Sequence, residues 1–238
     1  MLGDKIEGMA THFSNEAIKF LRGLKRNNDR AWFEERRAIY ERELRTPMLA
    51  LISEINEAMA AFSPMHVRPP QKIMMRIYRD IRFSKNKQPY KTHLSGWWAR
   101  DGLEKTSGGG FYFHVSPEEV FIAAGVYMPE REQLLAIRRY LAEHHQEFRA
   151  LMKAKKLRTL MTEFDGASLT RAPKGFPEDH PAIDLLKNRQ WGVSAKLPAE
   201  IATKPSLVKE VVQRFRAAAP VIALLNEPLV GKPKRPLF

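Results

Sequence analysis

The stretch GFYFHVSPEEVFIAAGV, residues 110–126, decides the fold of this chain. Aromatic and β-branched residues fill its two halves, and the Pro-Glu-Glu between them is typical of a turn. Two such runs joined by a short polar turn predict an antiparallel hairpin. HLSGWWA (93–99) and KIMMRIY (72–78) have a similar β-like composition. We therefore expect an antiparallel meander of about four strands between residues 72 and 126.

Helical patterns flank the predicted meander on both sides. Before it, Ser14 and Asp29 suit the N-caps of two helices, and Pro47 suits the first turn of a third helix. After it, amphipathic helices are expected over 129–156 and 205–218. The sequence between these two helices predicts a short strand, a Pro/Gly-rich loop, a short helix and another strand.

Helices, then a meander, then helices with one or two further strands are typical of the α+β class. We expect a single compact domain over residues 1–238, in which N-terminal helices pack on the antiparallel sheet and C-terminal helices complete the core. The core of this domain spans residues 12–225, and residues 226–238 form an extended tail.

The composition excludes several classes of protein. The chain of 238 residues has no cysteine, which excludes disulfides and thiolate metal sites. No run of about 18 apolar residues predicts a membrane span, and the N-terminus does not resemble a signal peptide. We expect a cytoplasmic protein without a membrane partner, and the oligomeric state stays open. No metal-ligand pattern, phosphate-binding loop or hydrolase motif occurs, so the sequence identifies no cofactor, metal or reaction.

The positive charge is unevenly distributed along the chain. The formal net charge is +13, yet residues 1–63 carry ten basic and ten acidic side chains. Residues 64–126 carry ten basic and five acidic side chains, and the rest of the excess lies further on. A surface of this kind attracts phosphates, nucleic acid or acidic partners at low salt. The charge is densest in RIYRDIRFSKNKQPYK, residues 76–91.

Alternation along an extended chain divides this basic segment into two faces. The face with Arg76 and Arg82 is polar, whereas the opposite face is apolar except for Arg79. A guanidinium on an apolar face needs a carboxylate or a bound anion. Asp80 points away from Arg79 in a regular strand, so either a bulge turns Arg79 to the polar face or a distant acid reaches it. The candidate acids on the second predicted helix are Glu34, Glu35 and Glu41.

SKNK, residues 84–87, predicts a turn. This turn would bring the basic side chains before and after it close together. Arginine forks and lysine point charges suit phosphate or carboxylate groups. We expect a basic cleft, where 76–93 meets 171–180, that binds a phosphate-bearing or other anionic small molecule. The ligand-binding candidates are Arg76, Arg79, Arg82, Lys87, Lys91, His93 and Lys174. Asp80, Tyr90 and His180 would orient the ligand or move protons, and whether a reaction follows stays open.

Two other interpretations stay open for the same residues. The protein would be a nucleic-acid-binding module if this face acts together with the basic run RALMKAKKLR, residues 149–158. Alternation sends one ring of the Trp97-Trp98 pair away from the core, where it could stack on a base. Alternatively, Asp80 is the hub of a structural ion-pair network that joins sheet to helices, and the protein acts through a protein partner.

The basic segment also resembles the signature of a known family. Arg-x-x-Arg-Asp-x-Arg-Phe, followed by Asn86-Lys87 and Tyr90, is similar to the motif of the DUF2461 family, uncharacterised bacterial and fungal proteins of similar length. Residues 20–41 and 169–191 resemble other blocks of that family, so the resemblance spans roughly residues 12–225. Asn86 stands where the family accepts Asp or Asn. The resemblance implies a family fold but no known activity, cofactor or catalytic residue.

Overall fold

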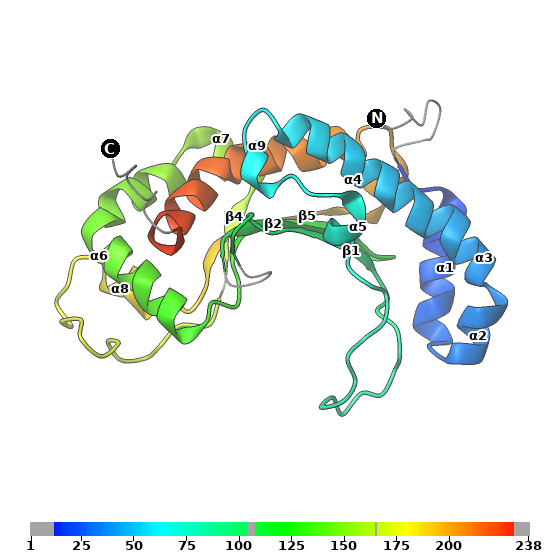
Figure 1. The fold of residues 1–238 in the computed structure, drawn as a ribbon, viewed down its shortest axis with the longest axis horizontal. Helices are drawn as coiled ribbons and strands as arrows, with labels where there is room; N and C mark the ends of the chain where they lie inside the picture. The colour runs from blue at the N-terminus through cyan, green and yellow to red at the C-terminus, as the bar shows by residue number, and fades with distance from the viewer. Residues whose placement is uncertain (1–11, 104–107, 165, 231–238) are drawn as a thin grey trace, which may run out of the picture.

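The centre of the molecule is an antiparallel β-sheet (Figure 1). The computed structural model describes residues 12–103, 108–164 and 166–230, and within them the sheet has five strands in the order β1-β2-β3-β5-β4. The strands are β1 (Leu94–Trp98), β2 (Gly110–Val115), β3 (Glu119–Val126), β4 (Thr162–Glu163) and β5 (Trp191–Pro198). The predicted α+β class is therefore confirmed.

The predicted hairpin over 110–126 is β2 and β3, which pair antiparallel with Val115 opposite Val120. Ser116 closes the turn, because its hydroxyl accepts hydrogen bonds from the N–H groups of Glu118 and Glu119 at 3.1 and 3.0 Å. Side chains at alternate positions of β2 point to opposite faces of the sheet. Phe111 and Phe113 are fully buried on one face.

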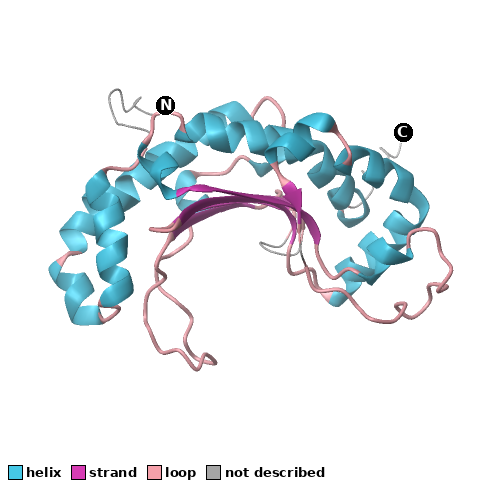
Figure 2. Cartoon of the chain, turned by 180° about the vertical axis from the view of Figure 1, so that it is seen from behind, coloured by secondary structure: helices cyan, strands magenta, loops and turns pink. Residues whose placement is uncertain are grey.

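Among the described residues, helices cover only that one face of the sheet (Figures 1 and 2). The helix α9 (Leu207–Asn226) packs across β2, β3 and β5, and α4 (Thr46–Met59) lies beside α9. The indole N–H of Trp98 in β1 donates to the side-chain oxygen of Asn56 in α4 at 2.9 Å. The other face carries no helix layer in the described part of the chain, and it is called the helix-free face below.

The N-terminal helices begin where their caps predict. Ser14 accepts from the N–H of Ala17 at 3.2 Å, and Asp29 accepts from the N–H of Trp32 at 2.9 Å. These caps start α1 (Asn15–Arg26) and α2 (Arg30–Glu35). The chain then runs through α3 (Arg37–Ile39) and a π-helical turn (Tyr40–Arg45) into α4, whose first turn contains Pro47.

The predicted strand over residues 72–78 is wrong. After a 3₁₀ turn (Pro64–His66), the chain forms the short helix α5 (Pro70–Ile73), because a proline at the first helical position favours a helix start. Only isolated bridges follow, between Met74 and Gly96 and between Tyr78 and Tyr90. The meander therefore contains β1, β2 and β3, and β5 and β4 extend the sheet beyond it.

The helix expected over 129–156 is two helices, α6 (Arg131–Met152) and α7 (Lys155–Leu160). The last helix, expected to end at residue 218, continues to Asn226 through Pro220. Its extra turns bury Val221, Ile222 and Leu225, and this burial outweighs the hydrogen bond that the proline removes.

The remaining C-terminal elements agree largely with the sequence pattern. The short helix is α8 (Ile183–Lys187), and the strand after it is β5. The short strand expected before them is a single bridge between Ser168 and Asn188. Two 3₁₀ turns, Ala199–Thr203 and Glu227–Leu229, flank α9. The end of the predicted extended tail, residues 231–238, lies outside the described residues.

No helix in the described ranges combines the length and the apolar character that a membrane span requires.

Candidate functional site

Residues 76–93, called the basic arm below, leave the sheet edge just before β1 and project away from α4 and α9 (Figures 1 and 2). The two sides of the arm pair antiparallel through the Tyr78–Tyr90 bridge. The N–H of Lys91 donates to the carbonyl of Ile77 at 2.8 Å. The turn predicted at SKNK therefore lies at the end of a narrow two-sided arm.

The base of the arm is fixed to the N-terminal helices by Tyr90. The Tyr90 ring is buried and stacks on Phe33 of α2, with ring centroids 4.2 Å apart. The Asn28 side chain accepts from the N–H of Tyr90 at 3.0 Å and donates to its carbonyl at 3.1 Å. Burial raises the pKa of the Tyr90 hydroxyl. These contacts anchor the arm at Tyr90, and the expected role of its hydroxyl in orienting a ligand stays a prediction.

Asp80 forms a local ion pair further along the arm. Arg82 donates to its two carboxylate oxygens at 3.0 and 2.7 Å. These hydrogen bonds lower the pKa of Asp80 to about 2, so the carboxylate is ionised at neutral pH. Asp80 makes no other ion pair with a described residue. A single pair within the arm gives little support to a network that joins sheet to helices.

Arg79 has no carboxylate partner in the described part of the chain. Its guanidinium donates to the Gln88 carbonyl at 3.3 Å and to the Ser84 hydroxyl at 3.4 Å. None of the three acids considered as partners reaches it, because each pairs with another arginine. The pairs are Glu34 with Arg37, Glu35 with Arg36 and Glu41 with Arg45.

The arm therefore carries a large excess of positive charge. Between residues 76 and 93 the sequence has six Lys and Arg residues and one acid, Asp80. Arg76 forms no ion pair with a described residue, and Lys87 donates to the Ile81 carbonyl at 3.0 Å. Phe83, expected on an apolar face, is 96% exposed, because the arm has left the core at this point.

The loop 171–180 lies far from the basic arm, at the other end of the sheet (Figure 1). Lys174 is exposed there, and the ring of His180 accepts from the N–H of Ala182 at 3.0 Å. The expected cleft between the two segments is therefore not formed. The sheet separates them, since the arm precedes the edge strand β1 and the loop precedes β5.

His93, at the base of the arm, joins a polar cluster on the helix-free face of the sheet. Its ring centroid lies 4.8 Å from that of His114 in β2. The Tyr112 hydroxyl is 3.2 Å from Nδ1 of His114, and Glu119 is 3.6 Å from its Nε2. Lys196 of β5 lies 3.3 Å from Glu119. Of these residues, only His93 was among the predicted ligand-binding residues.

Both histidines of this cluster are neutral at pH 7. Burial lowers the pKa of His93 and of His114 to about 4, and the Lys196 ammonium contributes at His114. A neutral imidazole is a hydrogen-bonding aromatic ring rather than a cation. Alternation in FYFHV already places Tyr112 and His114 on one face, but the sequence gives no signal for their cross-strand neighbours.

A cavity of about 280 Å³ lies where the basic arm begins. Arg37, Arg45 and Arg76 line it together with Tyr40 and Glu41. Glu41 pairs with Arg45 at 3.3 Å, so the cavity keeps a net positive charge.

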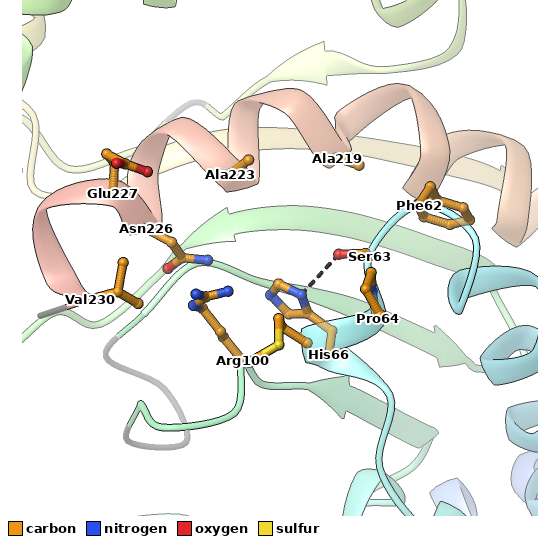
Figure 3. Close-up of a pocket in the computed structure, with 11 residues that line it drawn as sticks. Phe62, Ser63, Pro64, His66, Arg100, Ala219, Ala223, Asn226, Glu227 and Val230 are labelled. Carbon is orange, nitrogen blue, oxygen red and sulfur yellow. Dashed lines mark hydrogen bonds between the residues drawn. The ribbon is translucent and has the colours of Figure 1, made fainter. Parts of the chain in front are cut away.

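A second cavity, of about 220 Å³, lies between the 3₁₀ turn at residues 64–66 and the end of α9 (Figure 3). His66 is buried there, 2.9 Å from the Ser63 hydroxyl and 3.1 Å from the Gly109 carbonyl. The Asn226 side chain accepts from the N–H of Gly109 at 2.7 Å and donates to its carbonyl at 3.0 Å. These hydrogen bonds attach the chain before β2 to α9, so we interpret these polar groups as stabilising the fold.

Comparison with known proteins identifies a family without a described activity. No curated protein matches the chain. Residues 16–223 match the model of a family described as a conserved hypothetical protein, DUF2461, in agreement with the resemblance of the basic segment. Because this match covers most of the chain, the protein belongs to the DUF2461 family.

Proposed function

We propose that the protein binds a phosphate-bearing ligand through the basic arm, and that this ligand is a nucleic-acid strand. The observation that carries the proposal is the charge of the arm, whose sequence over residues 76–93 has six Lys and Arg residues and a single acid, Asp80. That carboxylate already forms an ion pair with Arg82. Cations such as Arg76 and Arg79, which have no carboxylate partner among the described residues, suit an external anion.

The extended shape of the arm favours a polyanion over a single small anion. One phosphate ion neutralises one or two side chains, whereas a strand presents a phosphate at every nucleotide and releases counterions at each contact. The exposed ring of Phe83 has the Arg82 guanidinium 5.8 Å from its centroid. Exposed aromatic rings beside cations are typical of surfaces that bind single strands.

The basic run at residues 149–158 does not extend this surface. Arg149 pairs with Asp184 at 2.6 Å, and α7 packs against α9 on the helix side of the sheet (Figure 1). The proposed contact with phosphates is therefore limited to the arm and its surroundings.

The test is a titration of fluorescently labelled oligonucleotides, followed by anisotropy at several salt concentrations. We compare Arg76→Gln/Lys87→Gln with a matched control, Lys204→Gln/Lys209→Gln, which removes two exposed charges elsewhere. If both arm residues contact phosphates of a single strand, the arm variant lowers the salt slope by about 1.4, and the control leaves it unchanged. Equal slopes in wild type and both variants would refute the proposal.

A small phosphorylated compound is the second candidate ligand, and the arginine-lined cavity near Arg76 favours it. Arg37, Arg45 and Arg76 line that cavity with only Glu41 as an acid. Arg45 lies on the π-helical turn and not on the arm. If the small ligand is correct, inorganic phosphate or a nucleotide raises the melting temperature and Arg45→Gln removes the shift. The nucleic-acid proposal predicts no effect of Arg45→Gln on strand binding.

A further inference from the structure

Five aromatic or imidazole rings lie next to one another on the helix-free face. The strand register places Trp97 opposite Tyr112, and His114 opposite Phe121, so these side chains share one face. The His114 ring centroid lies 4.8 Å from His93, 5.6 Å from Tyr112 and 5.2 Å from Phe121. The centroids of Trp97 and Tyr112 are 6.4 Å apart. We call these five rings the ring cluster.

The ring cluster differs from the core in its access to solvent. Phe111 and Phe113, on the covered face of β2, are fully buried, whereas Tyr112 and His114, which alternate with them along the strand, are partly exposed. Trp97 is only 8% exposed, and its indole Nε1 has no hydrogen-bond partner among the described residues. A sheet face with aromatic rings and unused polar atoms, and without a helix above it, can receive a flat ligand.

The ring cluster is continuous with the basic arm. His93 is part of the cluster, and it follows the arm residue Lys91 by two positions in the chain. On the other side of the cluster, Lys196 is exposed beside Glu119 and opposes Phe121 in the register of β3 and β5. A strand whose phosphates contact the arm would therefore continue across the rings.

We propose that the ring cluster binds unpaired bases, so that the ligand of the protein is single-stranded nucleic acid. This inference rests on the proposed binding of phosphates by the arm, and it names the part of the ligand that the sheet recognises. The near-neutral face, with His93 and His114 uncharged, suits base faces better than phosphates. In a duplex the base faces are stacked on each other, so a duplex offers only its phosphates.

The experiment separates bases from phosphates in the ligand. Wild-type protein is titrated with a single strand of about twelve nucleotides and with the same strand carrying about four central abasic sites. Both strands have the same phosphates. We expect the abasic strand to bind more weakly by about fivefold to 150-fold for each stacked base that is lost. The duplex of the same sequence should bind through its phosphates alone, with the steeper salt slope of a duplex.

Protein variants locate the effect. Tyr112→Leu/Phe121→Leu removes two rings and keeps apolar side chains, and Phe62→Leu is the control, because Phe62 packs on the helix side near Arg216. The ring variant should bind the intact strand as weakly as the abasic strand, whereas the control should keep the difference. Far-ultraviolet circular dichroism verifies that the variants fold.

The possible outcomes are distinguishable. If intact and abasic strands bind equally and with the same salt slope, the ring cluster does not bind bases, although the arm still binds phosphates. If an intact strand is preferred but the ring variant keeps the full preference, the bases bind elsewhere and the inference is again wrong. If no nucleic acid binds at any salt concentration, the proposed function itself fails.

Discussion

The two faces of the central sheet differ although the same strands build both. On the covered face, Phe111, Phe113 and Val115 of β2 are fully buried under α9 and its neighbours. On the helix-free face, Tyr112 and His114 of the same strand remain partly exposed, and His114 lies against Glu119 and His93. One face thus stabilises the domain, and the other presents titratable and aromatic groups that a core does not need.

This difference separates residues that are required for folding from candidates for function. A buried ring contributes its full transfer free energy and leaves a cavity when removed. A partly exposed ring without a helix above it contributes less to the free energy of unfolding. Such a ring can contact a ligand without being required for folding. The comparison predicts effects of different size on the two faces, and three experiments test it.

The largest effect is expected from removal of a ring on the covered face. Phe113→Ala should lower the free energy of unfolding by about 3–5 kcal/mol, because a fully buried phenyl ring is lost and a cavity remains. Tyr112→Ala, the neighbouring ring on the helix-free face, should cost clearly less. Chemical denaturation measures both values. Equal losses would mean that the two faces do not differ as the structure indicates.

A smaller effect is expected from acid. The pKa of His114 is about 4 in the folded protein, against about 6.5 in an unfolded chain, so the unfolded state binds the proton first as the pH falls. His114 therefore costs no stability above pH 6.5 and lowers the free energy of unfolding between about pH 6.5 and 4, by roughly 2 kcal/mol at pH 4.5. Denaturation curves at pH 7 and 4.5 should show a smaller acid loss in His114→Asn. If the variant loses as much free energy of unfolding between pH 7 and 4.5 as the wild type, other groups cause the loss. One such group is His66, whose pKa is also lowered to about 4.

The smallest effect on stability is expected from Lys196→Gln on the helix-free face. Its ion pair with Glu119 is largely exposed on the lysine side, so the free energy of unfolding should change by less than about 0.5 kcal/mol. The pKa of His114 should rise, because the Lys196 ammonium lowers it in the wild type. NMR titration of the histidine ring protons measures this shift. A fall in the pKa of His114 would show that the ammonium does not act on that ring as the geometry indicates.

Local patterns predicted the parts of the fold that depend on neighbouring residues. The caps at Ser14 and Asp29 and the hairpin over 110–126 could be predicted, because a cap or a tight turn is decided within a few residues. The strand expected over 72–78 is wrong for a long-range reason, since extended chain becomes a regular strand only when a partner pairs along its whole length.

The candidate site could be predicted in its charge but not in its surroundings. The excess of cations around Arg79 can be read directly from the sequence, and so can the lack of nearby acids within the arm. Glu34 pairs locally with Arg37, three positions further along the chain, and only the tertiary structure shows that it forms no ion pair with Arg79. The separation of the arm from the loop 171–180 depends on the order of the strands, which sequence spacing does not reveal.

The sequence by itself determined the charge of the basic arm, the caps and hairpin of the fold, and the alternation that separates Phe113 from His114. These properties follow from composition and from backbone geometry over a few residues. Only the tertiary structure decided which face of the sheet the helices cover and that His93, His114 and Glu119 meet on the other face. Such neighbours come from pairings between distant segments, whose free energy depends on the packing of the whole domain.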